Sequence, residues 1–112
     1  MIFVNSPAYF FSPIEQFVIL GTNFTKADTA TRSRFAITKP QADEIYKKAA
    51  SLGLSDFFIL STCNRTEFYG CTHVETVKEL VSEFLELGAE DVQNYFYHMN
   101  GVEAVRHFFR VV

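Results

Sequence analysis

A short polar segment between two apolar runs carries the residues best suited to chemistry. It reads Ser61-Thr62-Cys63-Asn64-Arg65-Thr66-Glu67 and places a thiol two residues before a fixed cation. A neighbouring positive charge favours the thiolate, which is the nucleophilic form of cysteine. A surface turn that merely contains a cysteine is the alternative reading, because one Cys without a family signature is weak support for catalysis.

The runs on either side of this segment predict two strands that it connects. Continuous apolar residues indicate a strand over residues 56–62, and a second strand is predicted over 66–72. A first strand is expected over residues 15–22, where the centre is β-branched and apolar. Three- and four-residue spacing of apolar positions predicts helices over 38–52 and 74–87, the second ended by Gly88, and a short helix is expected over 29–35.

The last part of the chain predicts one more strand and one more helix. Residues 92–99 alternate in a strand-like manner, and Asn100-Gly101-Val102-Glu103 has the spacing of a capping box. In the helix that follows, we expect Val102, Val105, Phe109 and Val112 to form the apolar stripe, with His107 away from it. The order strand–helix–strand–strand–helix–strand predicts an α+β, ferredoxin-like βαββαβ antiparallel sheet with helices on one face, plus a C-terminal helix.

Length and composition limit the class of protein. The 112 residues are 48% hydrophobic and 21% charged, which favours one small folded domain, and the net charge of −3 does not favour a general nucleic-acid binder. No signal sequence or run of about 18 apolar residues occurs, so we expect no membrane span and a cytoplasmic location. Cys63 and Cys71 could meet across a hairpin, but a reduced pair is favoured, and Cys71, His73 and His98 lack zinc-site spacing, so no metal is expected.

The central segment, extended to Tyr69, resembles the signature around the nucleophilic cysteine of glutamyl-tRNA reductases. Residues 21–35 are similar to the N-terminal substrate loop and short helix of that family, and residues 104–111 are similar to the helix that closes its catalytic domain. The resemblance therefore spans roughly residues 16–112. The loop departs from the family pattern at four positions, which are Phe24, Lys26, Asp28 and Ala30.

The resemblance implies a role for each candidate site residue. Cys63 would attack the aminoacyl ester of glutamyl-tRNA to form a thioester, and His107 would orient the ester or exchange protons. Arg65 would bind the glutamate carboxylate through its planar fork, and Thr62 and Asn64 would hydrogen-bond the substrate. Simpler readings stay open: Arg65 pairs with Glu67, Thr62 and Asn64 shape a turn, and His107 is a surface residue of its helix.

The resemblance also implies what lies outside this chain. In the family, NADPH reduces the thioester to glutamate-1-semialdehyde for tetrapyrrole biosynthesis. No glycine-rich dinucleotide fingerprint occurs in the sequence, so this chain is not expected to bind NADPH. We expect residues 1–112 to be an N-terminal catalytic domain that stops before nucleotide-binding and dimerisation domains, within a homodimer that could contact the next enzyme, an aminomutase.

Two other functions remain open from sequence. The chain could be a non-catalytic ferredoxin-like module that binds RNA or a protein, and its many Phe residues, 13 in all, suit a protein partner. It could also be a cysteine-dependent ester hydrolase, which shares the thiol and His107 but finishes the reaction with water. The reactivity of the Cys63 thiol distinguishes the module from both enzymes.

Overall fold

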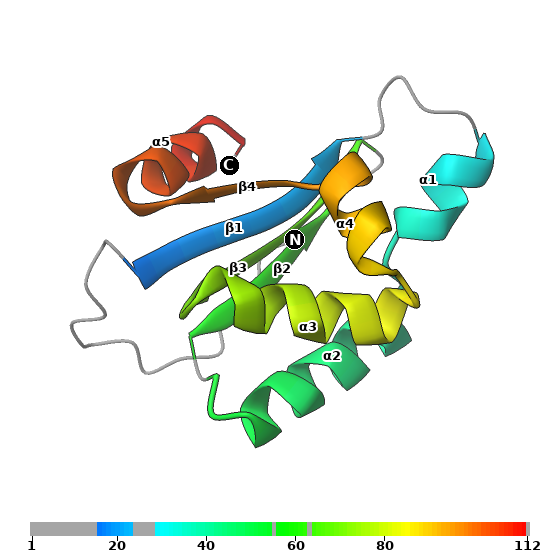
Figure 1. The fold of residues 1–112 in the computed structure, drawn as a ribbon, viewed down its shortest axis with the longest axis horizontal. Coiled ribbons are helices and arrows are strands. Elements are labelled where there is room, and N and C mark those ends of the chain that lie inside the picture. Colours follow the sequence, from blue (N-terminus) through cyan, green and yellow to red (C-terminus); the bar gives the residue numbers. More distant parts are fainter. Residues whose placement is uncertain (1–15, 24–28, 55, 63, 112) are drawn as a thin grey trace.

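The computed structural model describes residues 16–23, 29–54, 56–62 and 64–111 and shows four strands and five helices there (Figure 1). No helix in these ranges combines the length and the apolar composition needed to cross a bilayer. In chain order the elements are β1 (Phe17–Asn23), α1 (Thr29–Phe35), α2 (Lys39–Ser51), β2 (Phe57–Ser61), β3 (Arg65–Cys71), α3 (Val74–Leu85), α4 (Ala89–Tyr95), β4 (Tyr97–Asn100) and α5 (Gly101–Val111).

The four strands form one antiparallel sheet in the order β2-β3-β1-β4. Helices α2 and α3 cover one face of this sheet, and α5 lies on the other (Figure 1). The crossover from β1 through α2 to β2 leaves room for β3 between the two strands, as the split βαβ pattern requires. The ferredoxin-like fold with an added C-terminal helix is therefore confirmed.

Strand β1 is buried on both faces, as its continuous apolar run predicts. Val18 and Leu20 belong to the core beneath α2 and α3, whereas Ile19 belongs to the core beneath α5. Side chains alternate across a strand, so one short segment contributes to two cores. The burial of both faces fixes the register of β1 firmly, because a slip of one residue would exchange the two sets.

The residues at both ends of helix α2 explain where it begins and ends. Thr38 is the N-cap: its hydroxyl accepts the N–H of Gln41, whose side chain in turn accepts the N–H of Thr38. Pro40 occupies the first turn, where a missing N–H costs nothing. Gly53 follows the helix with a φ of +80°, a conformation that few other residues adopt readily.

The prediction of a strand over residues 92–99 is wrong in its first half, because Ala89–Tyr95 is the helix α4. Asp91 accepts the N–H of Gly88 at 3.3 Å and the guanidinium of Arg34 at 3.0 Å, so one carboxylate caps the helix and ties it to α1. The end predicted for the preceding helix is also corrected. Helix α3 stops at Leu85, and Glu86, with a φ of 53°, ends it in a left-handed conformation two residues before Gly88.

The apolar stripe predicted for the last helix is wrong at Val102 and Phe109, and its Val112 lies outside the described residues. Val102 and Phe109 are 57% and 75% exposed, whereas Ala104 is fully buried against the sheet. Phe108 packs beside it, with its ring 5.3 Å from that of Tyr69 and 5.6 Å from that of Phe58. The side of α5 that carries Ala104 and Phe108 therefore packs on the aromatic face of the sheet. His107 is largely buried as a result, with 14% of its side chain exposed.

Candidate active site

The face of the sheet beneath α5 is built from rows of residues paired across the strands. The row Phe58, Tyr69, Ile19 and Met99 is apolar; the next row contains Leu60, Glu67, Gly21 and Tyr97; the last pairs Arg65 with Asn23. The polar residues therefore lie at one end of the sheet. The three sequence segments that carry the family resemblance meet at this end.

Gly21 makes the close approach in the middle row possible. A Cβ at this position would lie 2.8 Å from Cγ of Glu67 and 3.0 Å from the hydroxyl oxygen of Tyr97. Real Cβ atoms essentially never lie 2.8 Å from another atom and rarely lie at 3.0 Å, so Glu67 would have to move and Tyr97 would have to shift slightly. The absence of a side chain at Gly21 lets Glu67 and Tyr97 reach each other across β1.

We predict that Gly21→Ala displaces Glu67 and lowers the free energy of unfolding by about 1–3 kcal/mol, the usual range for overpacking a tight interior. Urea unfolding of the purified chain measures the change. Gly70→Ala is the matched control, because a Cβ there meets its nearest atom at 3.5 Å, an ordinary contact distance. Equal stability of the two variants would contradict this account of Gly21.

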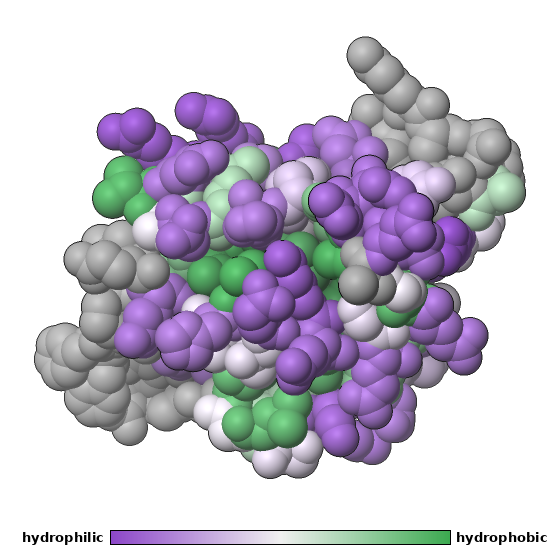
Figure 2. Space-filling view, viewed as in Figure 1, coloured by the Kyte–Doolittle hydropathy of each residue, from purple (hydrophilic) through white to green (hydrophobic). Residues whose placement is uncertain are grey.

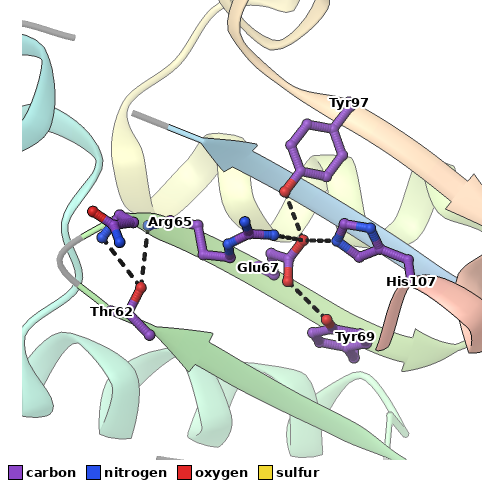
Figure 3. A network of polar contacts seen from close by, with 7 residues as sticks. Thr62, Arg65, Glu67, Tyr69, Tyr97 and His107 are labelled. Atoms are coloured by element: carbon purple, nitrogen blue, oxygen red, sulfur yellow. Dashed lines mark hydrogen bonds and ion pairs between the residues drawn. The ribbon is translucent and has the colours of Figure 1, made fainter. Parts of the chain in front are cut away.

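Glu67 is the centre of a polar network that reaches three elements (Figure 3). Its side chain is 0% exposed. The hydroxyl of Tyr69 donates to Oε1 at 2.7 Å, and the hydroxyl of Tyr97 donates to Oε2 at 2.6 Å. His107 Nε2 lies 2.5 Å from the same Oε2, and Arg65 Nη1 approaches it from the other side at 3.9 Å. A buried carboxylate is tolerated only when it is paired in this way.

The same carboxylate keeps the two tyrosines protonated. Burial raises the pKa of Tyr69 and of Tyr97 above the ordinary value, and donation to the negatively charged Glu67 raises it further. The nearby Arg65 opposes this rise in both cases. Both hydroxyls therefore remain donors to Glu67 well above neutral pH.

The turn after β2 is held by the hydroxyl of Thr62. Its Oγ1 accepts the N–H of Asn64 at 3.2 Å and that of Arg65 at 3.3 Å (Figure 3). The Thr62 N–H in turn donates to the carbonyl of Arg65 at 2.9 Å. Turn shaping is thus one observed role of Thr62, and its hydroxyl proton remains able to donate to a bound molecule.

A cavity of about 360 Å³ opens beside this turn, and two arginine residues line it. Thr62, Asn64 and Arg65 line it from the turn, and Arg110 lines it from α5. Arg110 was not predicted from the sequence as a site residue. Two guanidinium groups on one small cavity suit a ligand with negative charge.

The structure brings together most of the residues predicted for the site. Thr62, Asn64 and Arg65 share the cavity, and both Arg65 and His107 approach Glu67. The simpler reading of Arg65 as a partner of Glu67 is therefore part of its geometry, although 3.9 Å is too long for a hydrogen bond. Cys63 lies outside the described residues, as do Phe24, Lys26 and Asp28 of the loop, and Ala30 is exposed on α1.

No group of three or more metal-binding side chains occurs within the described ranges. Cys71 is half-buried at the end of β3 that lies away from Arg65. A second hollow of about 680 Å³ lies between α3, α4 and β4, where Figure 2 shows apolar surface bordered by polar residues. Its floor includes Leu20 and Phe96, and Glu75 and Glu79 contribute to its wall. It holds none of the predicted site residues.

The fold and the site together define a class: a ferredoxin-like domain with a polar, cation-lined cavity beside the turn between its second and third strands. The sequence model of the family described as "Glutamyl-tRNAGlu reductase, N-terminal domain" matches residues 20–112. The chain belongs to this family.

Curated relatives agree over most of this chain. It is 37% identical over 99 residues to a glutamyl-tRNA reductase of Heliobacterium mobile, covering 83% of this chain and 22% of the relative. It is 33% identical over 96 residues to one of Flavobacterium psychrophilum, covering 85% and 23%. The solved glutamyl-tRNA reductase from Methanopyrus kandleri superposes with a TM-score of 0.62 at 25% identity, covering 87% of this chain and 22% of that one. The chain thus spans less than a quarter of the length of these proteins.

Proposed function

We propose that this chain is the acylation domain of a glutamyl-tRNA reductase, in which the Cys63 thiolate takes the glutamyl group from glutamyl-tRNA. One observation carries the proposal. Thr62 and Asn64, the sequence neighbours of Cys63, line the same cavity as Arg65 and Arg110. Family membership supports the substrate, because the relatives bear the name of an enzyme that acts on glutamyl-tRNA.

The proposed step is a transfer of an acyl group from oxygen to sulfur. The Cys63 thiolate attacks the ester carbonyl carbon, a C–S bond forms, and the C–O bond to the terminal ribose breaks. The ribose oxygen leaves with a proton, and the glutamyl group stays on the protein as a thioester. Cysteine suits this step because it is intrinsically nucleophilic and needs little activation.

The charges of the cavity favour a glutamyl group over neutral acyl groups. Arg65 is 25% exposed, so its guanidinium is partly desolvated and yet reachable from the cavity. A carboxylate that enters can pair with both oxygens on such a planar fork. Arg110, which lines the same cavity from α5, adds a second cation for the same carboxylate or for a phosphate of the tRNA end.

The reduction that would follow is not assigned to this chain. We propose NADPH as the hydride donor of the whole enzyme and assign none of its contacts to this chain, whose sequence has no glycine-rich turn for the pyrophosphate. The whole enzyme is also proposed to be a homodimer that passes its aldehyde to an aminomutase. A reactive aldehyde makes direct transfer to the next enzyme advantageous.

Transfer of radiolabelled glutamate from glutamyl-tRNA to the chain tests the proposed function. After ribonuclease digestion of the tRNA, label should remain on the acid-precipitated protein and should be released from it by neutral hydroxylamine, as expected of a thioester. Label that never joins the protein, while free glutamate accumulates with no detectable protein-bound intermediate, would instead indicate a direct hydrolase.

We predict that Arg65→Lys reduces the preference for glutamyl over glutaminyl substrates by about tenfold to a hundredfold, because an ammonium group cannot reproduce the two-point fork. Competition between the two charged tRNAs in the labelling reaction measures the preference. Arg106→Lys is the control, since Arg106 is an exposed residue of α5 that does not line the cavity. An unchanged preference in Arg65→Lys would reject this role and leave Arg65 as a partner of Glu67.

A further inference from the structure

Glu67 lies at a position where burying a carboxylate costs free energy. It is fully buried within β3, and its side chain occupies space that a Cβ at position 21 would fill. Among the described residues, every buried side-chain nitrogen or oxygen has a hydrogen-bond partner. An apolar residue in this row would need no such network. The arrangement therefore points to a role for the carboxylate itself.

The contacts of Glu67 indicate which ring nitrogen of His107 carries a proton. Oε1 accepts the hydroxyl of Tyr69, and Oε2 accepts both the hydroxyl of Tyr97 and Nε2 of His107. An ionised carboxylate can only accept, so Nε2 carries the proton in this contact when Glu67 is charged. Nδ1 is then the ring atom that remains to exchange a proton with another group.

His107 does not line the cavity itself, but two residues that follow it on α5 do. Arg110 and Val111, three and four residues further on, line the cavity, and residues at this spacing share one face of a helix. The imidazole is 14% exposed, so it is neither sealed in the core nor free in solvent. A ring held in this position by Glu67 can serve a molecule bound in the cavity.

We propose that Glu67 is a positioning residue, held by Tyr69 and Tyr97, which fixes His107 so that its Nδ1 delivers a proton to the departing ribose oxygen. This inference rests on the proposed function. In the step, the imidazolium loses its Nδ1 proton to the ribose oxygen as the C–O bond breaks and the C–S bond to the thiolate forms. The neutral ring keeps its Nε2–H bond to Glu67, and water restores the Nδ1 proton after the alcohol leaves.

The first test is the tautomer of His107 in the unmodified chain. Nitrogen-15 NMR of the imidazole distinguishes the two neutral forms, and His107→Gln assigns the signal among the three histidines of the sequence. We expect the neutral ring to be protonated at Nε2. A neutral ring protonated mainly at Nδ1 would overturn the proposal without the need for any Glu67 variant.

The second test compares two glutamyl esters with different leaving groups. A glutamyl ester of adenosine releases a ribose alkoxide, a poor leaving group that needs a proton from an acid. A p-nitrophenyl ester of glutamate releases p-nitrophenolate, which leaves without protonation. Glu67→Leu should slow acylation by the adenosine ester by on the order of a hundredfold, the low end for general acid catalysis, and acylation by the nitrophenyl ester by less than about tenfold. Equal slowing with both esters, or none, would overturn the proposal.

Two further variants separate positioning from stability. Tyr97→Phe keeps the ring and removes one donor to Glu67, so it should slow only the adenosine ester, by about tenfold or less. Val77→Ala destabilises the core on the opposite face and should leave the ratio of the two rates unchanged. If the unmodified chain accepts neither ester, the proposed function fails, and the NMR result still decides how Glu67 holds His107.

Discussion

Cys63→Ser should abolish thioester formation with glutamyl-tRNA and lower the acylation rate by on the order of a thousandfold or more, as expected for loss of a nucleophile. Serine is nearly the same size as cysteine, but its hydroxyl is a weak nucleophile without a strong base beside it. The cavity residues Thr62, Asn64 and Arg65 would be unchanged. The variant should therefore still bind glutamyl-tRNA, which a filter-binding assay measures separately from acylation.

Cys71→Ser is the matched control for this experiment. Cys71 is half-buried and lies at the far end of β3, beyond the apolar row that contains Tyr69. Its replacement should leave both acylation and binding close to those of the unmodified chain. Near-normal acylation by Cys63→Ser, or loss of acylation in Cys71→Ser alone, would show that the nucleophile is assigned to the wrong residue.

Tyr69→Ala should lower the free energy of unfolding by about 3–5 kcal/mol, the range seen when a buried aromatic ring is removed. The Tyr69 ring is completely buried and stacks on Phe58 at 4.5 Å, with the Phe108 ring edge-on at 5.3 Å. Its loss would leave a cavity between the sheet and α5 and remove a donor from Glu67. Urea unfolding followed by circular dichroism measures the change.

Tyr69→Phe separates the ring from its hydroxyl. It keeps the packing and removes one hydrogen bond to a buried carboxylate, so the expected cost is about 1–3 kcal/mol. The raised pKa of Tyr69 in the folded chain means that its hydroxyl stabilises fully below about pH 10, the unfolded value, and less as the pH rises above it. Tyr69→Phe should therefore lose less stability between neutral and alkaline pH than the unmodified chain. Equal cost for Tyr69→Ala and Tyr69→Phe would contradict the packing role of the ring.

The sheet could be predicted from the sequence because its strands follow local rules. The apolar run of β1 and the turn between β2 and β3 can both be recognised from composition and spacing. The order of elements then leaves few possible topologies, and the ferredoxin-like arrangement is the expected one. Helix α1 was also predicted at its observed bounds.

The errors arise where distant residues decide local structure. Helix α4 depends on Asp91, which is bound by Arg34 from 57 positions away, and nothing within residues 92–99 reveals that contact. The choice of Phe108 over Phe109 as the buried residue of α5 depends on the aromatic rings of the sheet. Periodicity alone favoured the other side of that helix.

The site was predicted in part for the same reason. Cys63 and Arg65 were proposed from their types and spacing, and His107 from the family resemblance, whereas the place of Glu67 needed the structure. Tyr97 and His107 lie 30 and 40 positions from Glu67, and only the register of β4 and the docking of α5 bring them to it. The local signal available was an acidic residue in a strand that continues with Phe68 and Tyr69.

The most direct test of the central claim is mass spectrometry of the chain after reaction with glutamyl-tRNA. The account predicts an intact mass increased by one glutamyl group, and peptide mapping at acidic pH should place that group on Cys63. The increase should disappear after treatment with neutral hydroxylamine. A folded chain that gains no glutamyl group, or carries it on a residue other than Cys63, would contradict the account.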